Sequence, residues 1–297
     1  MSRIHFEQLP ADVRQAVADK TGAVHQAVTA PGGMNSGIAS VIDTDSGPVF
    51  LKGIPTDHPQ VRAQHREAAV APHLPASCPR LYWHLELNGW SLLGYEAVDG
   101  RHADYAPGSP DLPLVEAALT DLQGITAPPD IEIKQAVDRW AEYAPHGTLH
   151  HFDGDALLHT DFAPDNVLIT GERARLIDWA WPTRGAAWID PGALALRLME
   201  AGHPAEDAID FAARFPSWRQ APPEALAAFG AATAVLWREI AEQDDAEWKR
   251  TMAERAAVLA EHLRDVTVPR PLESVRGTGR RRSAASEETR PRRPCGT

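Results

Sequence analysis

Short runs of apolar and β-favouring residues mark much of the N-terminal third of the chain. Short apolar runs fill residues 22–55, and Gly, Asp and Ser separate them, a pattern that favours an antiparallel meander of strands. Two more strands are predicted at residues 81–87 and 90–98, because the Asn88-Gly89 pair between them is preferred in two-residue hairpins. The intervening residues 59–71 have apolar positions at helical spacing, so we expect one helix beside this small sheet.

Beyond residue 98 the apolar positions take the spacing of amphipathic helices. The predicted helices cover residues 112–125, 131–144, 190–202, 205–215, 223–243 and 245–266. Between them, short β runs are expected at residues 156–160, 165–170 and 174–180. Another short helix is expected within residues 5–20, where Pro10 and Asp12 favour a helix start.

These elements predict an α+β fold class and a division of the chain into parts. Residues 1–98 form a small sheet with one helix, and residues 99–273 form a larger, mainly helical part with a β hairpin inside it. Residues 274–297 hold seven arginines against two glutamates, together with Ser, Pro and Gly. Because this last segment has no hydrophobic period, we expect a disordered basic tail.

Composition narrows the class of protein. Of the 297 residues, 43% are hydrophobic and 24% are charged, ordinary values that exclude fibrous and wholly disordered chains. The net charge of −12 argues against a nucleic-acid partner, which requires a basic surface. The longest apolar run is too short to span a bilayer, and the N-terminus lacks the pattern of a secretory signal. With only Cys78 and Cys295 present, no disulfide framework is expected, so the sequence predicts a cytoplasmic protein without a membrane partner.

A group of polar side chains in the middle of the chain carries the candidate chemistry. His159, Thr160 and Asp161 are followed by Asn166, and Asp178 comes after a predicted β hairpin. Phosphoryl transfer needs a carboxylate that orients the attacking hydroxyl, and it needs a bound divalent cation. Asp161 suits the first role as the catalytic residue. Asn166 and Asp178 suit the second as metal ligands, since magnesium prefers hard oxygen donors.

The pattern H-x-D-x(4)-N followed by I-D-W resembles the aminoglycoside phosphotransferases and choline kinases, a group within the protein-kinase-like superfamily. The resemblance covers roughly residues 20–200, and it implies a two-lobed kinase-like fold with ATP and Mg²⁺ as cofactors. Thr160 stands where the group often has Gly, and Asp178-Trp179-Ala180 replaces the D-F-G of protein kinases. The second difference is typical of small-molecule kinases and points away from protein substrates. In this group the residue matching His159 is structural.

The resemblance also assigns roles to residues upstream, in the N-terminal lobe. A lysine on the third strand would contact the phosphates of ATP and would be held by a glutamate on the next helix. A glycine-containing loop would lie over the phosphates, and the backbone after the fifth strand would meet the adenine edge. The cofactor-binding residues predicted in this way are Lys52, Glu67, Gly33, Asn35, Ser36, Glu96 and Val98.

Structural interpretations compete with several of these assignments. Asp161 and Asn166 also favour turns, and Glu67 also suits a solvated helix face. Asp190, which precedes a proline, suits a helix N-cap, and the alternative is that it braces the loop after Asp178. A zinc site is a further alternative in the histidine-rich segment 146–155, although its spacing matches no helical zinc motif.

We therefore expect an enzyme, an O-phosphotransferase that uses ATP and Mg²⁺ to phosphorylate a hydroxyl of a small molecule. The acidic composition favours a cationic acceptor, so an aminoglycoside or related cationic antibiotic is the first hypothesis. A metabolite kinase for choline, an amino alcohol or a sugar is the alternative. A non-catalytic nucleotide-binding module is the third hypothesis. The chain is expected to be a monomer or a homodimer.

Overall fold

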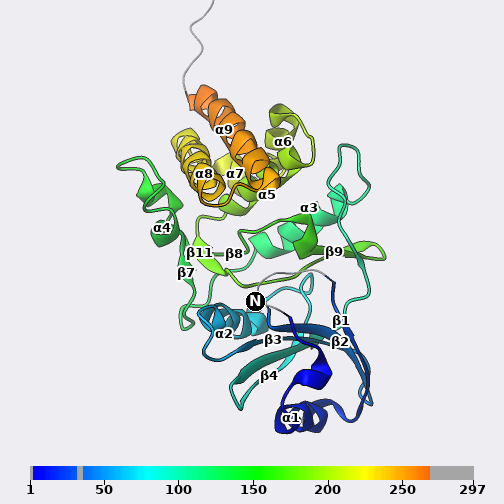
Figure 1. Cartoon of the computed structure of the whole chain (residues 1–297). Coiled ribbons are helices and arrows are strands. Elements are labelled where there is room, and N and C mark those ends of the chain that lie inside the picture. Colours follow the sequence, from blue (N-terminus) through cyan, green and yellow to red (C-terminus); the bar gives the residue numbers. More distant parts are fainter. Residues whose placement is uncertain (1–2, 32–35, 268–297) are drawn as a thin grey trace, which may run out of the picture.

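The computed structural model describes residues 3–31 and 36–267 of the chain (Figure 1). A five-stranded sheet with two helices occupies one end of the molecule, and a group of helices occupies the other end. Short strands lie between these two ends. The predicted contacts Gly33 and Asn35 lie outside the described residues, as does the basic tail at residues 274–297.

The N-terminal sheet has five antiparallel strands. Their order is β1 (Val24–Thr29), β2 (Ile38–Thr44), β3 (Val49–Pro55), β5 (Trp90–Glu96) and β4 (Leu81–Leu87). Every neighbouring pair is antiparallel, which confirms the predicted meander and hairpin. Asn88 and Gly89 have positive φ angles of 44° and 76°, which a tight hairpin turn requires.

Alternation along β3 gives the two faces of this sheet different roles, because successive side chains point to opposite faces. Leu51 is fully buried in an apolar core formed with helix α1 (Ala11–Thr21). Lys52 points to the other face, toward helix α2 (Val61–Val70). The sheet therefore separates an apolar core from the face that carries charge.

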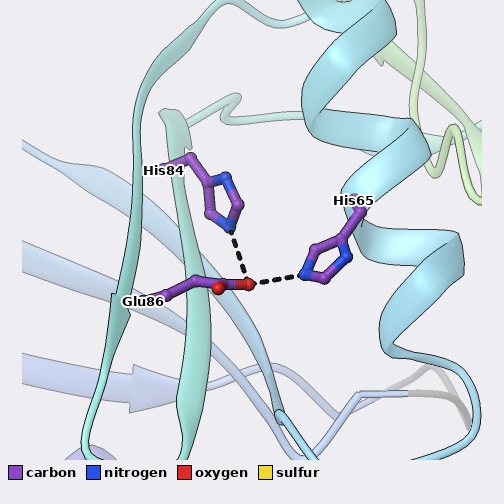
Figure 2. A group of neighbouring side chains, drawn as sticks. All are labelled: His65, His84 and Glu86. Atoms are coloured by element: carbon purple, nitrogen blue, oxygen red, sulfur yellow. Dashed lines mark hydrogen bonds and ion pairs between the residues drawn. The ribbon is translucent and has the colours of Figure 1, made fainter. Parts of the chain in front are cut away.

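Helix α2 is fixed to the sheet by polar contacts. Gln64 Nε2 donates to the backbone oxygen of Ser91 on β5 at 2.6 Å. On the outer side of the helix, His65 Nε2 lies 2.5 Å from Glu86 Oε1 of the edge strand β4 (Figure 2). These contacts reach the two neighbouring strands β5 and β4 at one side of the sheet, so they hold the helix at two places.

The C-terminal part combines two small sheets with most of the helices. One sheet has the order β10 (Arg173–Leu176), β9 (Val167–Thr170), β6 (Arg101–His102), and the other β7 (Lys134–Gln135), β11 (Thr183–Gly185), β8 (Ala156–Leu158). The helices are α3 (Leu112–Gln123), α4 (Ala136–Arg139), α5 (Ile189–Glu200), α6 (Ala205–Ala212), α7 (Pro216–Gln220), α8 (Pro223–Gln243) and α9 (Glu247–Thr267). One apolar core connects them. The expected division at residue 98 falls between β5 and β6 and stays a prediction.

The helix predicted over residues 131–144 is wrong. This segment forms the short strand β7 and the single turn α4 instead of one continuous helix. Its helical spacing does place Ala136 and Trp140 in the core. However, Lys134 pairs in parallel with Thr183 of β11, so a tertiary backbone contact overrides the local pattern.

Helices α8 and α9 pack closely at a glycine. A Cβ atom on Gly230 of α8 would lie 2.9 Å from the Cα atom of Ala260 in α9, closer than such atoms approach. The absence of a side chain at Gly230 therefore sets the distance between the two helices. Among the described residues, no helix is both long enough and apolar enough to cross a membrane.

We expect Gly230→Leu to destabilise the protein. Overpacking a helix contact costs about 1–3 kcal/mol, which exceeds the gain of about 1 kcal/mol in helix propensity over glycine. Urea denaturation measures the change in unfolding free energy. Ala231→Leu, at a half-buried neighbouring position, is the matched control and should change stability less. Equal stability of Gly230→Leu and wild type would contradict the close packing.

Candidate active site

A chain of ion pairs joins the N-terminal sheet to the C-terminal part. Lys52 Nζ lies 2.8 Å from Glu67 Oε2 of α2 and 2.7 Å from Asp178 Oδ1, which follows β10. The side chains of Lys52 and Glu67 are only 14% and 4% exposed. The structure thus brings together three predicted site residues that come from separate elements.

Burial and charge act in opposite directions on these three groups. Burial would lower the pKa of the Lys52 ammonium, but the carboxylates of Asp178 and Glu67 outweigh it and raise that pKa. The charge of Lys52 in turn lowers the pKa of Asp178, against desolvation, which raises it. Burial raises the pKa of Glu67, and the ion pair with Lys52 opposes this rise. At neutral pH a lysine cation therefore faces an ionised Asp178.

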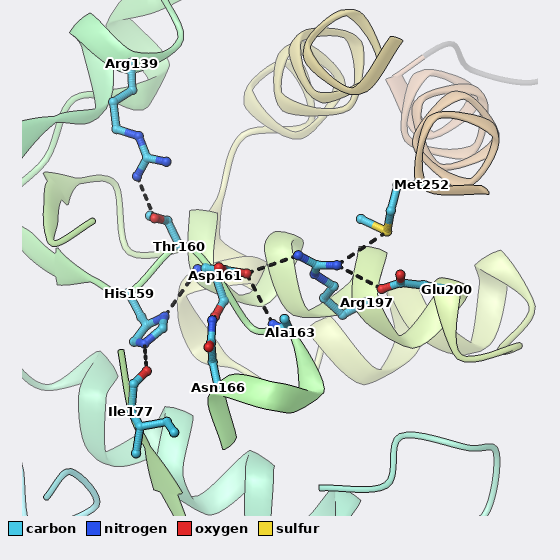
Figure 3. Close-up of polar contacts among 10 residues, drawn as sticks. All are labelled: Arg139, His159, Thr160, Asp161, Ala163, Asn166, Ile177, Arg197, Glu200 and Met252. Carbon is cyan, nitrogen blue, oxygen red and sulfur yellow. Dashed lines mark hydrogen bonds and ion pairs between the residues drawn. The ribbon is translucent and has the colours of Figure 1, made fainter. Parts of the chain in front are cut away.

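Asp161 lies on a loop between β8 and a single 3-10 turn, Pro164–Asn166 (Figure 3). Its side chain is 40% exposed, so the carboxylate is accessible. Asn166 Nδ2 donates to the backbone oxygen of Asp161 at 3.2 Å, which turns the segment back on itself. Because Nδ2 is the donor in this bond, Oδ1 is the end of the Asn166 amide that remains for a cation.

The two predicted metal ligands lie on neighbouring segments. The backbone N–H of Ile177 donates to the backbone oxygen of Asn166 at 2.9 Å, and Asp178 is the next residue. Together the side chains offer one amide oxygen and one carboxylate, a donor set that fits Mg²⁺. Asp178 also has a φ of 61°, a conformation that is uncommon outside glycine and clusters at functional sites.

His159 connects the Asp161 loop to the segment before Asp178. Its Nε2 lies 2.9 Å from the backbone oxygen of Ile177, and its Nδ1 lies 3.3 Å from the backbone nitrogen of Asp161. A carbonyl only accepts and an amide N–H only donates, so Nε2 carries the proton and Nδ1 accepts. Both ring nitrogens are used within the fold, which matches the structural role that the resemblance implies for His159.

The carboxylate of Asp190 binds the backbone of the loop that carries Asp161. Its Oδ2 accepts from the His159 N–H and its Oδ1 from the Thr160 N–H, both at 2.9 Å. The predicted N-cap role of Asp190 is wrong, because α5 already begins at Ile189 and the carboxylate bonds to the loop. Thr160 has a φ of 67°, and its hydroxyl accepts from Arg139 Nη1 at 2.5 Å. These contacts stabilise a backbone conformation that glycine adopts without strain.

Arg197 is a site residue that the sequence analysis did not find. Its Nη2 donates to Asp161 Oδ1 at 3.1 Å, and its Nη1 donates to Glu200 Oε2 at 2.9 Å (Figure 3). The guanidinium lies 5.5 Å from the ring centroid of Trp237, and 14% of the side chain is exposed. The sequence does contain an indication of this contact. Arg197 interrupts the apolar run 193–199, and a charged side chain in a buried run needs a partner of opposite charge.

The remaining predicted nucleotide contacts lie at two places in the N-terminal part. Ser36 is half-buried and stands two residues before β2. The Glu96 N–H donates to the backbone oxygen of Arg80 at 2.8 Å, and the Glu96 carboxylate lies 2.7 Å from Arg175 Nη2. Val98 is half-buried in the segment between β5 and β6. The N–H of Glu96 is therefore already used within the fold.

The histidine-rich segment does not gather into the alternative zinc site. The rings of His150 and His151 pack against each other with centroids 4.0 Å apart. Across the part of the chain that the structure describes, ligand atoms of three metal-binding side chains converge only at His65, His84 and Glu86. Residues 146–155 therefore lack the geometry that a zinc ion requires.

The buried Asp190 makes stability depend on pH. Burial raises its pKa to about 6, against the backbone hydrogen bonds that lower it. Because this value exceeds the ordinary 3.8, the stabilisation from proton binding is complete below pH 3.8 and is lost as pH rises through about 6. We expect the unfolding free energy of wild type, relative to Asp190→Asn, to fall by at most about 3 kcal/mol across this window. Urea denaturation of both proteins measures it, and a difference that is flat with pH would contradict the assignment.

Comparison with known proteins identifies the fold. No profile of a known protein family matches the sequence, and no curated protein matches it. A thermostable mutant of aminoglycoside phosphotransferase APH(4)-Ia, in complex with ADP and hygromycin B, is 15% identical, with a TM-score of 0.52 over 83% of this chain and 98% of that chain. Choline kinase LicA from Streptococcus pneumoniae is 11% identical, with a TM-score of 0.54 over 86% of this chain and 98% of that chain.

A third solved structure agrees with these two. A putative aminoglycoside phosphotransferase from Ralstonia eutropha is 11% identical, with a TM-score of 0.54 over 86% of this chain and 97% of that chain. All three similarities extend over nearly the whole of the compared structures. The chain therefore has the two-lobed, protein-kinase-like α+β fold of the aminoglycoside phosphotransferases and choline kinases.

Proposed function

We propose that this chain is a small-molecule O-phosphotransferase that transfers the γ-phosphoryl group of ATP, with Mg²⁺, to a hydroxyl of its acceptor. The observation that carries the proposal is the contact of Lys52 with both Glu67 and Asp178. The ammonium that we propose as the phosphate-binding cation thus lies beside the carboxylate that we propose as a metal ligand. Solved structures with this fold include complexes with ADP and with AMP, which supports a nucleotide as the ligand.

The N-terminal lobe and the β9–β10 hairpin would hold the nucleotide. Lys52 is oriented by Glu67 and would bind the phosphates, while Asn166 and Asp178 would hold Mg²⁺. When bound, MgATP supplies the phosphoryl group and the cation that neutralises its charge. Gly33, Asn35 and Ser36 are proposed to lie against the phosphates. For the adenine edge we propose the backbone from Glu96 to Val98, apart from the Glu96 N–H, which is already bonded to Arg80.

Asp161 would act on the acceptor. One of its carboxylate oxygens, Oδ1, accepts from Arg197, so Oδ2 is the oxygen directed to an incoming hydroxyl. In the proposed step the acceptor oxygen forms a bond to phosphorus, the bond from phosphorus to the leaving oxygen of ADP breaks, and the hydroxyl proton passes to Asp161. Arg197 fixes the carboxylate, so the proton acceptor keeps one orientation throughout.

Two acceptor classes follow from different observations. An aminoglycoside or related cationic antibiotic is the first, supported by the net charge of −12 and by the hygromycin B in one compared structure. A metabolite such as choline, an amino alcohol or a sugar is the second, supported by the similarity to choline kinase LicA. A non-catalytic module fits less well, because the chain has every polar residue that the proposed centre needs. These residues are Lys52, Glu67, Asp161, Asn166 and Asp178.

Release of ADP from MgATP in the presence of candidate acceptors tests the proposed function. The panel contains aminoglycosides, peptide antibiotics, choline, other amino alcohols and sugars. We expect acceptor-dependent release that Asp161→Asn lowers by roughly 10²–10⁴, because general-base catalysis contributes that much. Asp165→Asn, an exposed carboxylate on the same loop, is the matched control and should retain activity.

Each outcome separates the hypotheses. Release with antibiotics alone identifies the first acceptor class, and release with choline, amino alcohols or sugars identifies the second. ATP binding without release for any acceptor supports the non-catalytic module and counts against the proposed function. Full activity in Asp161→Asn would show that the catalytic assignment is wrong.

Arg197→Met tests the role of Arg197 as a positioning residue. Loss of its bond to Asp161 frees the carboxylate to rotate, so we expect kcat to fall on the order of 10- to 100-fold. The acceptor KM should change less, and Arg197→Lys should recover part of kcat because it keeps the charge. Arg238→Met, on exposed α8 surface near Glu242, is the control. A rise in acceptor KM at unchanged kcat would show instead that Arg197 binds the acceptor.

A further inference from the structure

Two histidines and a glutamate converge on the outer surface of the N-terminal lobe, away from the proposed catalytic centre. His65 comes from α2, whereas His84 and Glu86 come from the edge strand β4 (Figure 2). His84 and Glu86 are two positions apart on one strand, so they point to the same face of the sheet, where α2 lies. The fold therefore brings a helix and an edge strand together at these three side chains.

The three ligand atoms are close enough to surround one ion. His65 Nε2 lies 2.5 Å and His84 Nε2 lies 3.7 Å from the same atom, Glu86 Oε1. One ligand atom from each residue lies within 4.8 Å of the other two. The side chains are 44%, 32% and 46% exposed for His65, His84 and Glu86, so an ion and a water molecule have access from solvent.

A simple histidine–carboxylate hydrogen bond accounts for only two of these three side chains. His25 and Asp45 show that simpler arrangement, with Nε2 and Oδ1 2.7 Å apart. At Glu86 a second imidazole lies nearby: His84 Nε2 is 3.7 Å from Glu86 Oε1 and 3.0 Å from Ser91 Oγ, and the ring centroids of His65 and His84 are 5.9 Å apart. A bound metal ion would take the place of the His65–Glu86 and His84–Ser91 contacts, with all three side chains as its ligands.

The donor types select the metal. Two imidazole nitrogens with one carboxylate oxygen and a water in the fourth position form a common zinc ligand set. Magnesium prefers an all-oxygen environment, so the metal of the nucleotide would not compete effectively here. We propose that His65, His84 and Glu86 form a binding site for Zn²⁺, or a similar divalent transition metal, that ties α2 to β4.

The site is independent of the proposed function but shares an element with it. Glu67, which contacts Lys52, follows His65 by two residues on α2. A metal bound between α2 and β4 would restrain the helix that carries Glu67. Since the metal would bind only the folded arrangement, it would also stabilise the protein, by an amount that grows with the logarithm of the metal concentration above the dissociation constant.

Calorimetric titration of the full-length, untagged chain with ZnCl₂ at about pH 7.5, where imidazole is mainly neutral, tests the proposal. We expect one Zn²⁺ per chain, and affinity at least about tenfold lower in each of His65→Ala, His84→Ala and Glu86→Gln. Co²⁺ should give the strong visible absorption of a four-coordinate ion in wild type and lose it in the variants. The melting temperature should rise with Zn²⁺ in wild type and should not rise in these three variants.

His25→Ala is the matched control, because it removes an exposed histidine from a histidine–carboxylate pair in the same lobe. Its zinc affinity should equal that of wild type. The side chains replaced are all partly exposed, and unchanged melting temperatures without metal would show that the variants fold. Two results would overturn the proposal: no zinc uptake by wild type, which would leave only hydrogen bonds, or uptake that survives all three substitutions.

Discussion

The Lys52 ammonium holds the two lobes of this fold together. It lies in the central part of an N-terminal sheet, yet one of its two carboxylate partners, Asp178, stands 126 positions further along the chain. Because only 14% of the lysine side chain is exposed, water replaces a lost partner poorly. In the buried pair that Lys52 forms with Glu67, whose side chains are 14% and 4% exposed, removal of one member costs about 3–5 kcal/mol. The positions of α2 and of the β9–β10 hairpin therefore depend on this one cation.

The loop that carries Asp161 shows how tertiary contacts compensate local strain. Thr160 has a positive φ angle of 67°, a conformation that costs about 1–3 kcal/mol. Hydrogen bonds to charged groups contribute about 1.5–3 kcal/mol each. Thr160 makes two of them, since its N–H donates to Asp190 and its hydroxyl accepts from Arg139. The contacts thus match or exceed the strain. As a result the loop keeps a fixed shape, and Arg197 reaches Asp161 from α5.

Side chains that could bind a cation form two groups with different ligand atoms, and the two groups lie at different places in the molecule. Oxygen donors gather at Asn166 and Asp178, next to the lysine that the proposed phosphates would meet. Imidazole donors gather at His65 and His84 on the outer surface of the N-terminal lobe. Helix α2 takes part in both groups through opposite sides, with Glu67 directed inward and His65 outward. One short helix therefore connects the proposed catalytic centre with the proposed zinc site.

The sequence by itself determined the features that depend on local order. Short β-rich runs and the Asn88-Gly89 pair specified the N-terminal sheet, and the H-x-D-x(4)-N spacing located Asp161 and Asn166 on one loop. Only the tertiary structure decided the contacts between distant elements. It replaced the helix at 131–144 with a strand paired to β11, directed Asp190 to the loop, and placed Arg197 against Asp161. Local patterns record which side chains are buried, whereas the partner of a buried charge is set by packing between elements far apart in the chain.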